Sequence, residues 1–232
     1  MINTIKYRYY MTQVLKDIFS DAELGTSLGF KGGTALMLFY DLPRFSVDLD
    51  FNLLVPEKND IVYQKIRKIV RKYGKIEDES QNFYGSLVVL DYGFTERKLK
   101  IEISNRQSND LYDVQNLLGI NIKVMTLSDM FSNKLCALLN RKDMVNRDIF
   151  DCWFLMNSRT TVNPTIIEKR MGKSLSDYLQ ECIDAIENLP DKSLLDGLGE
   201  LVNHEMKTFI RNKLRFEILF LLRLYKELPL TD

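Results

Sequence analysis

The spacing of hydrophobic residues divides the chain into two parts. Up to about residue 125, short stretches that alternate apolar and polar residues, the period of a half-buried strand, are mixed with stretches at helical spacing. From Thr126 onward the periodicity is helical. The pattern therefore predicts an α+β fold, in which a mixed sheet with flanking helices over residues 1–125 precedes an all-helical half over residues 126–232.

The first part contains candidates for both kinds of element. The predicted helices cover residues 4–19, 34–42 and 60–73, and the predicted strands cover residues 28–30, 47–55, 84–93, 98–104 and 120–125. Thr34 is a candidate N-cap of the second helix, because a threonine oxygen can accept a hydrogen bond from the first helical turn. The strands at 84–93 and 98–104 are close enough in sequence to form a hairpin through the stretch GFTER.

The second part reads as a series of helices. Ser128 is the candidate N-cap of a helix in the stretch TLSDMFSNKLCALLNR, and the stretch NRDIFDCWFLM is a further helix. Two later helical stretches, at roughly 165–188 and 194–226, are separated by prolines.

Composition excludes several kinds of chemistry. The chain has 232 residues, 45% of them hydrophobic and 28% charged, and its formal net charge is zero, so nucleic-acid affinity would need local basic patches. The three cysteines are widely spaced, without a metal-binding pair, which fits a reducing cytoplasm. We expect no membrane segment, because the late apolar run at 218–222 is far too short. With one histidine, catalysis would rest on carboxylates and lysines.

The stretch KGGTALMLFYDLPRFSVDLDF combines a glycine turn with two alternating acids. A glycine turn before a helix presents backbone N–H groups to a phosphate, here at Gly32 and Gly33. Asp48 and Asp50 are two apart on a predicted strand and therefore project from one face, while Leu49 and Phe51 are expected to face the core. Two carboxylates side by side repel each other unless a cation lies between them, and hard oxygen ligands suit magnesium or manganese.

A third carboxylate lies on a later strand. Glu102, in the stretch KLKIEIS, alternates with isoleucines and shares a face with Lys100 and Ser104. If this strand lies beside the Asp48–Asp50 strand, the three acids converge. Each feature alone is commonly structural, a turn or a solvated strand face. Together, in this order, they indicate phosphoryl or nucleotidyl transfer.

The same stretch closely resembles the opening signature of the AbiEii-type toxins, to which the MenT toxins are related, in the nucleotidyltransferase superfamily. The resemblance implies a nucleotidyltransferase-like fold, with Asp48, Asp50 and Glu102 as metal ligands and catalytic residues. It also implies Mg²⁺, or Mn²⁺ in its place, as the cofactor. By the same resemblance Gly32, Gly33, Thr34 and Ser46 bind the nucleotide, and Arg44 and Ser46 add to the match.

A second block, NKLCALLNRKDMVNRDIFDCWFLM, resembles the second signature of this family. Lys134 and Arg141 are seven apart and share a helix face if the helix persists that far. The resemblance implies that Lys134 is a catalytic residue that contacts the triphosphate. It also implies that Arg141 and Asp148 shape the nucleotide pocket and that Asp151 supports them, so that the helical half completes the nucleotide site. The alternative is a solvated helix with ion pairs, or a buried Arg–Asp pair that joins two helices.

The function implied is that of a toxin in a type IV toxin–antitoxin system of the abortive-infection kind. It would be a transferase (EC 2.7.7-like) that moves a nucleoside monophosphate from an NTP to an acceptor hydroxyl. The resemblance implies the tRNA 3′ end as acceptor, growth inhibition through translation, and a cognate antitoxin. Alternatives are a protein or small-molecule acceptor, or a non-catalytic NTP-binding module. Basic segments at 65–75 and 207–226 are candidate RNA contacts.

Overall fold

A computed structural model describes residues 4–93, 97–106, 108–141, 143–190 and 194–231. The chain forms two compact units. The first unit comprises Met1–Asp41 and Phe45–Met125, and the second comprises Leu42–Arg44 and Thr126–Asp232. The short link Leu42–Arg44 therefore groups with the helical half of the chain. The sequence pattern did not predict this grouping.

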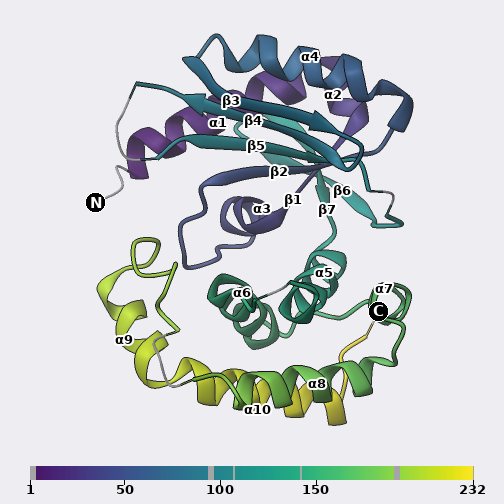
Figure 1. Cartoon of the computed structure of the whole chain (residues 1–232), viewed down its shortest axis with the longest axis vertical. Coiled ribbons are helices and arrows are strands. Elements are labelled where there is room, and N and C mark those ends of the chain that lie inside the picture. The colour runs from purple at the N-terminus through teal and green to yellow at the C-terminus, as the bar shows by residue number, and fades with distance from the viewer. Residues whose placement is uncertain (1–3, 94–96, 107, 142, 191–193, 232) are drawn as a thin grey trace. The chain divides into compact units, whose positions relative to one another are not determined.

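The first unit is built on one mixed sheet (Figure 1). Its seven described strands lie in the order β3-β4-β5-β2-β1-β7-β6. The strands are β1 (Leu28–Lys31), β2 (Asp48–Leu53), β3 (Lys75–Asn82), β4 (Gly85–Asp91), β5 (Leu99–Ser104), β6 (Tyr112–Leu117) and β7 (Ile120–Met125). β2 runs parallel to β5 and antiparallel to β1, so the strand with the two aspartates is central.

Helices cover both faces of this sheet. They are α1 (Thr4–Ser20), α2 (Ala22–Ser27), α3 (Gly32–Phe39) and α4 (Asn59–Val70), with a short 3₁₀ turn, η1 (Pro56–Lys58), before the last. Figure 1 shows α1, α2 and α4 along one face and α3 on the other. Leu49 and Phe51 are fully buried, and the ring of Phe51 lies 6.2 Å from that of Phe19 in α1. These apolar residues of β2 therefore fix which way its aspartates point.

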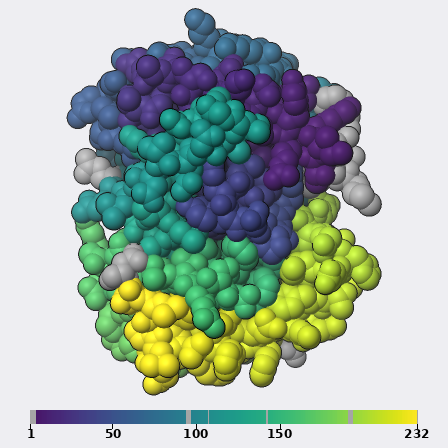
Figure 2. All heavy atoms as spheres, turned by 180° about the vertical axis from the view of Figure 1, so that it is seen from behind, coloured from purple at the N-terminus to yellow at the C-terminus, as the bar shows by residue number. Residues whose placement is uncertain are grey.

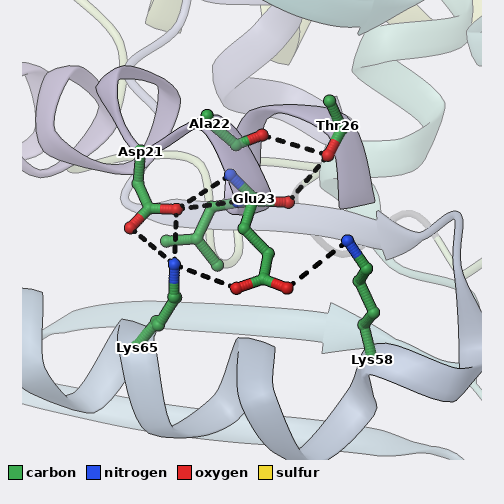
Figure 3. Close-up of polar contacts among 7 residues, drawn as sticks. Asp21, Ala22, Glu23, Thr26, Lys58 and Lys65 are labelled. Atoms are coloured by element: carbon green, nitrogen blue, oxygen red, sulfur yellow. Dashed lines mark hydrogen bonds and ion pairs between the residues drawn. The ribbon is translucent and has the colours of Figure 1, made fainter.

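A charged cluster fixes α2 against α4 (Figure 3). The Asp21 carboxylate caps α2 by accepting hydrogen bonds from the backbone N–H groups of Glu23 and Leu24. The Lys65 ammonium of α4 lies 2.9 Å from Asp21 and 3.0 Å from Glu23. Lys65 lowers the pKa of both carboxyl groups. This lysine of the basic segment 65–75 thus has a structural role.

The β6–β7 hairpin forms the edge of the sheet opposite β3. In Figure 2 the hairpin (teal) lies on the surface next to α1 (purple). A small hollow between them is lined by Gln13 of α1 and by Leu118 and Ile120 of the hairpin, among others. Its turn has two left-handed residues, Leu118 and Gly119. Packing on α1 stabilises this edge of the sheet.

The second unit consists of helices around a buried core. They are α5 (Leu127–Asn140), α6 (Asn146–Asn157), α7 (Pro164–Met171), α8 (Leu175–Glu187), α9 (His204–Asn212) and α10 (Leu214–Glu227). The cysteines Cys136, Cys152 and Cys182 are free and buried, consistent with packing roles. Tyr178 of α8 donates a hydrogen bond to the carbonyl of Leu135 in α5, at 2.8 Å.

Several local predictions need correction. Thr34 and Ser128 are not N-caps, because α3 and α5 begin earlier, at Gly32 and Leu127. The strands β3 and β6 were not predicted, because as sheet edges their residues are mostly exposed and polar. The long stretch 165–188 is interrupted at Gly172, which adopts a left-handed conformation.

The basic segment near the carboxyl terminus also differs from expectation. Lys207, Arg211 and Arg215 do not form one ridge, because Lys213 separates α9 from α10. Arg215 donates hydrogen bonds to the carbonyls at the end of α8, including Glu187 at 2.8 Å. One of the expected RNA contacts is therefore a helix cap.

Candidate active site

The glycine turn lies directly against the second aspartate of the acid pair. Gly32 has φ +82°, in the left-handed region that favours glycine. A Cβ added at this position would lie 2.4 Å from Oδ2 of Asp50. The residue must therefore be glycine both for its backbone conformation and for the close approach of the carboxylate. Gly33 is buried in the first turn of α3.

The register of β2 and β5 places the three acids together. In the parallel pair β2–β5, Asp50 is the partner of Glu102 and Asp48 is the partner of Lys100. Partners in register share a face of the sheet, so Asp48, Asp50 and Glu102 project from the same face, opposite buried Leu49. The expectation that the Glu102 strand lies beside the aspartate strand is confirmed.

Two lysines share this face: Lys100, which the sequence pattern already placed beside Glu102, and Lys31, which was not singled out. Lys31 is the partner of Asp50 across the antiparallel β1–β2 pair, and Lys100 is the partner of Asp48. Opposite charges in register attract each other, so these lysines offset part of the carboxylate repulsion. Lys31 precedes the Gly-Gly pair directly, and this adjacency is the signal that could have identified it.

Thr34 holds the acid strand to the glycine helix. Its side chain is fully buried, and its hydroxyl donates a hydrogen bond to the backbone carbonyl of Asp48 at 2.5 Å. The hydroxyl is therefore engaged inside the protein. Ser46 is also buried, and its N–H donates to the sulfur of Met37 in α3 at 3.4 Å. Both residues couple α3 to the start of β2.

The three acids do not form a closed metal site as they stand. Among the described residues, no group of three or more His, Cys, Asp or Glu side chains is gathered so that it could hold a metal ion. Their donor chemistry nonetheless fits magnesium, because all three offer carboxylate oxygens on neighbouring strands. Asp48 and Asp50 are half-buried and Glu102 is exposed, so solvent reaches all three carboxylates.

The second unit contains a separate ionic network. The buried guanidinium of Arg44 binds the Asp151 carboxylate through two hydrogen bonds, Nε to Oδ1 at 2.6 Å and a terminal nitrogen to Oδ2 at 2.7 Å. The Lys134 ammonium lies 2.8 Å from Asp151 and 3.0 Å from Asp148. Arg44 lies in the link before β2. From the sequence it counted only as part of the family resemblance, whereas in the structure it is the main partner of Asp151 in this network.

Arg141 joins the network from outside α5. The helix ends at Asn140, and Arg141 has an extended backbone, so the expected shared helix face with Lys134 does not form. Its Nε still lies 3.1 Å from Oδ2 of Asp148, although this approach is not aligned as a hydrogen bond. Asp148 therefore lies between two cations, Lys134 and Arg141.

Burial and pairing shift the pKa values in this network. Burial alone lowers the pKa of Lys134, but Asp151 and then Asp148 outweigh it and raise the pKa to about 12. Burial raises the pKa of Asp151, but Arg44 and Lys134 outweigh it and hold the pKa below its usual value. The lysine is charged and the aspartate ionised at neutral pH. Burial, followed by the neighbouring Asp148 and Asp151, raises the pKa of the Cys152 thiol.

Solved structures share this fold. The structure of JHP933 from Helicobacter pylori matches with a TM-score of 0.61 at 19% identity, over 98% of this chain and 93% of that one. A candidate nucleotidyltransferase from H. pylori matches with a TM-score of 0.62 at 19% identity, over 98% of this chain and 96% of that one. No curated relative matches the sequence.

The sheet with its glycine turn and acid strands is that of a nucleotidyltransferase. The family model of the nucleotidyl transferase AbiEii toxins of type IV toxin–antitoxin systems matches residues 13–219, and the chain belongs to this family. It is a nucleotidyltransferase with a nucleotide substrate, and its family implies an antitoxin as partner. No helix in the described ranges is long and apolar enough to cross a membrane.

Proposed function

We propose that the protein is a magnesium-dependent toxin that transfers a nucleoside monophosphate from an NTP to an acceptor hydroxyl of RNA, the tRNA 3′ end. The modification would block translation and growth. The observation that carries the proposal is the register of β2 and β5, which puts Asp48, Asp50 and Glu102 on one face beside the Gly32 turn. Nucleotide binding alone does not require three carboxylates on one face.

Asp48 and Asp50 would hold the metal, with Glu102 as the third ligand. When bound, magnesium supplies positive charge that offsets the charge developing on the leaving pyrophosphate. Lys31 and Lys100, in register with the two aspartates, add fixed positive charge to the same face. The face would then attract a triphosphate although three carboxylates lie on it.

The chain's own groups would orient the reactants. The backbone N–H groups of Gly32, Gly33 and Thr34 lie in the first turn of α3 and would donate to phosphate oxygens. Glu102 is exposed and would accept the proton of the acceptor hydroxyl as that oxygen attacks the α-phosphorus. The bond to the pyrophosphate oxygen breaks as the new phosphodiester bond forms.

The ionic network of the second unit would bind phosphate through its surplus charge. Arg44, Lys134 and Arg141 are three cations that share the two carboxylates of Asp148 and Asp151, so one positive charge is left over. The side chain of Arg141 is 51% exposed and is the member that an anion can reach. Asp148 and Asp151 would position Lys134.

The RNA acceptor rests on the family resemblance. Basic residues of the segment 65–75 are partly engaged inside the first unit: Arg67 pairs with Glu79 at 2.5 Å, and Lys72 with Asp17 at 2.9 Å. They lend the RNA proposal little support. A protein or small-molecule acceptor therefore remains the alternative to be tested.

Label transfer tests the proposal. Purified protein is incubated with magnesium, each α-labelled NTP in turn, and total bacterial RNA, a protein extract or a panel of small hydroxyl compounds. We expect label in a tRNA-sized band that requires both magnesium and the wild-type chain. Label only in proteins or small molecules would refute the RNA acceptor, and no label in any fraction would refute catalytic transfer.

A further inference from the structure

Two large aromatic side chains occupy the tip of the β3–β4 turn. Asn82 and Gly85 are the last paired residues of the two strands, so Phe83 and Tyr84 form the tip. Phe83 is 87% exposed and Tyr84 63% exposed. Two-residue hairpin turns favour glycine, asparagine and aspartate, so the turn itself gives no reason for this pair. Side chains that neither form the turn nor fill the core point to a surface role.

The aromatic tip is held rigidly. The Asn82 side-chain oxygen accepts hydrogen bonds from the N–H groups of Tyr84, at 2.9 Å, and Gly85, at 3.2 Å. The N–H of Asn105, just beyond β5, donates to the carbonyl of Tyr84 at 2.9 Å. The two rings lie edge to face, with centroids 5.2 Å apart. A fixed aromatic surface loses little conformational entropy when a ligand stacks on it.

A hollow of about 590 Å³ adjoins this tip. Phe83 and Tyr84 line it, and so do Leu53, the last residue of β2, and Pro56 at the start of η1. Arg106 completes the wall, with its guanidinium carbon 5.6 Å from the centre of the Tyr84 ring. The hollow therefore combines flat aromatic faces, an apolar floor and one cation.

Two asparagine side chains form an amide edge of this hollow, and one of their oxygens can still accept a hydrogen bond. Asn59 and Asn105 both line it, and the Asn105 amide nitrogen donates to the Asn59 oxygen at 3.1 Å. The Asn105 side-chain oxygen is buried and accepts no hydrogen bond from the described residues. A buried acceptor without a partner costs free energy, which a ligand N–H group would recover.

We propose that this hollow binds a base of single-stranded RNA, and that it is the subsite through which the acceptor strand approaches the acid face. The base would stack on the aromatic tip, which any base can do through its π-face. Its exocyclic amino group would donate to Asn105, and Arg106 would stack or pair with the adjoining phosphate. The inference rests on the proposed function, because it treats RNA as the acceptor.

The position along β5 connects the hollow to the acid face. Glu102 lies on β5, and Arg106 follows four residues later, a span of about 13 Å for extended chain. Leu53 in the hollow shares the buried face of Leu49 and Phe51. Glu102 lies on the opposite face. One extended nucleic-acid strand that passes over the carboxyl end of β5 can cover this span with its hydroxyl end at Glu102. A polypeptide would also find apolar and amide groups here, but the combination of a flat aromatic surface, a guanidinium and an amide edge favours a base.

Equilibrium binding of a fluorescein-labelled single-stranded RNA, measured by anisotropy in EDTA so that no transfer occurs, tests the inference. The full-length protein is compared with a Phe83→Ala/Tyr84→Ala double variant and with Arg106→Gln. Tyr9→Ala removes an exposed aromatic side chain, 58% exposed, from α1 and serves as the matched control. All the substituted side chains lie at the surface, so unfolding midpoints should stay unchanged.

We expect the double variant to bind at least about 10-fold more weakly, Arg106→Gln to bind more weakly, and Tyr9→Ala to stay within about 2-fold of the wild type. Double-stranded RNA should compete poorly. Unchanged affinity of the double variant, or an equal loss in Tyr9→Ala, would overturn the subsite. A double variant that loses transfer to a protein acceptor but keeps its RNA affinity would assign the hollow to a polypeptide instead.

Label transfer measured in parallel separates the two proposals. If the wild type labels no acceptor but its RNA binding depends on Phe83 and Tyr84, the proposed function fails and the subsite stands. If the wild type labels RNA and the double variant labels it with the same acceptor KM, the function stands and the subsite is wrong.

Discussion

Asp151 binds Arg44 through two hydrogen bonds of 2.6 and 2.7 Å, although the two residues are 107 positions apart in the chain. Both side chains are almost completely buried, 3% exposed for Arg44 and 0% for Asp151. The pair explains why Leu42–Arg44, which link α3 to β2, group with the second unit. The segment between the glycine helix and the acid strand is thus fixed by a charge pair.

Breaking this pair should be costly. Arg44→Met leaves the Asp151 carboxylate buried with one partner fewer, so we expect the free energy of unfolding to fall by about 3–5 kcal/mol. Urea unfolding followed by circular dichroism measures the change. In the matched control Lys173→Met, which breaks the exposed pair with Glu181, the loss should be about 1 kcal/mol or less. Equal losses in the two variants would contradict the account.

Gly32→Ala should damage the site through contact as well as backbone strain. Gly119 is a matched control, because it has φ +84° against +82° for Gly32, but an added Cβ there meets nothing within 4 Å. We expect Gly119→Ala to lose about 1 kcal/mol of stability from strain alone and to keep its transferase activity. Gly32→Ala should lose more stability, because Asp50 must move. It should also lose most of its transferase activity. Similar stability and activity in both variants would exclude a role for the contact with Asp50.

The Thr34 hydroxyl should matter through its hydrogen bond to the Asp48 carbonyl. Thr34→Val keeps the shape but removes the donor, so we expect a loss of about 1–3 kcal/mol and a lower kcat. Thr34→Ser retains the hydroxyl and should recover most of the activity. If the valine variant has normal kcat and stability, the hydrogen bond does not position β2. If serine fails as badly as valine, the lost methyl group matters more than the hydroxyl.

The contribution of Lys134 to the free energy of unfolding should depend on pH. Because its pKa is raised to about 12, its ionic contribution is fully present below the unfolded value of about 10.4 and is lost as pH rises through about 12. The difference in unfolding free energy between wild type and Lys134→Met should therefore be constant from neutral pH to about pH 10 and shrink above it. Urea titrations across this range measure it. A difference that shrinks below about pH 9 would contradict the assignment.

The sequence predicted the candidate site best in β2, where the alternation of apolar and acidic residues defines both the strand and the direction of its carboxylates. Alternation in β2 predicted that Leu49 and Phe51 face the core, which fixed the direction of Asp48 and Asp50. The pairing of β2 with β5 was expected only conditionally, because strand register depends on contacts remote in sequence. The adjacency of Lys31 to the Gly-Gly pair could have marked it as a site residue, but its pairing with Asp50 follows only from the register of β1 and β2.

Features that depend on tertiary contacts were missed or misassigned. The edge strands β3 and β6 carry mostly polar residues and lack alternation, so only pairing defines them. Thr34 was taken for a helix cap because residue type alone does not reveal that its hydroxyl binds the carbonyl of Asp48. Arg141 was placed on a helix that ends one residue earlier, yet still reaches Asp148 from an extended backbone.

The most direct test of the account is nucleotide transfer by Asp50→Asn, which keeps the shape of the side chain and removes its charge. Glu57→Gln, at an exposed acid outside the site in the same unit, is the control. With α-labelled NTP, magnesium and RNA, we predict that Asp50→Asn transfers label at least about 100-fold more slowly, with unchanged folding, and that Glu57→Gln matches the wild type. If Asp50→Asn transfers label at the wild-type rate, the acid face of β2 is not the catalytic centre.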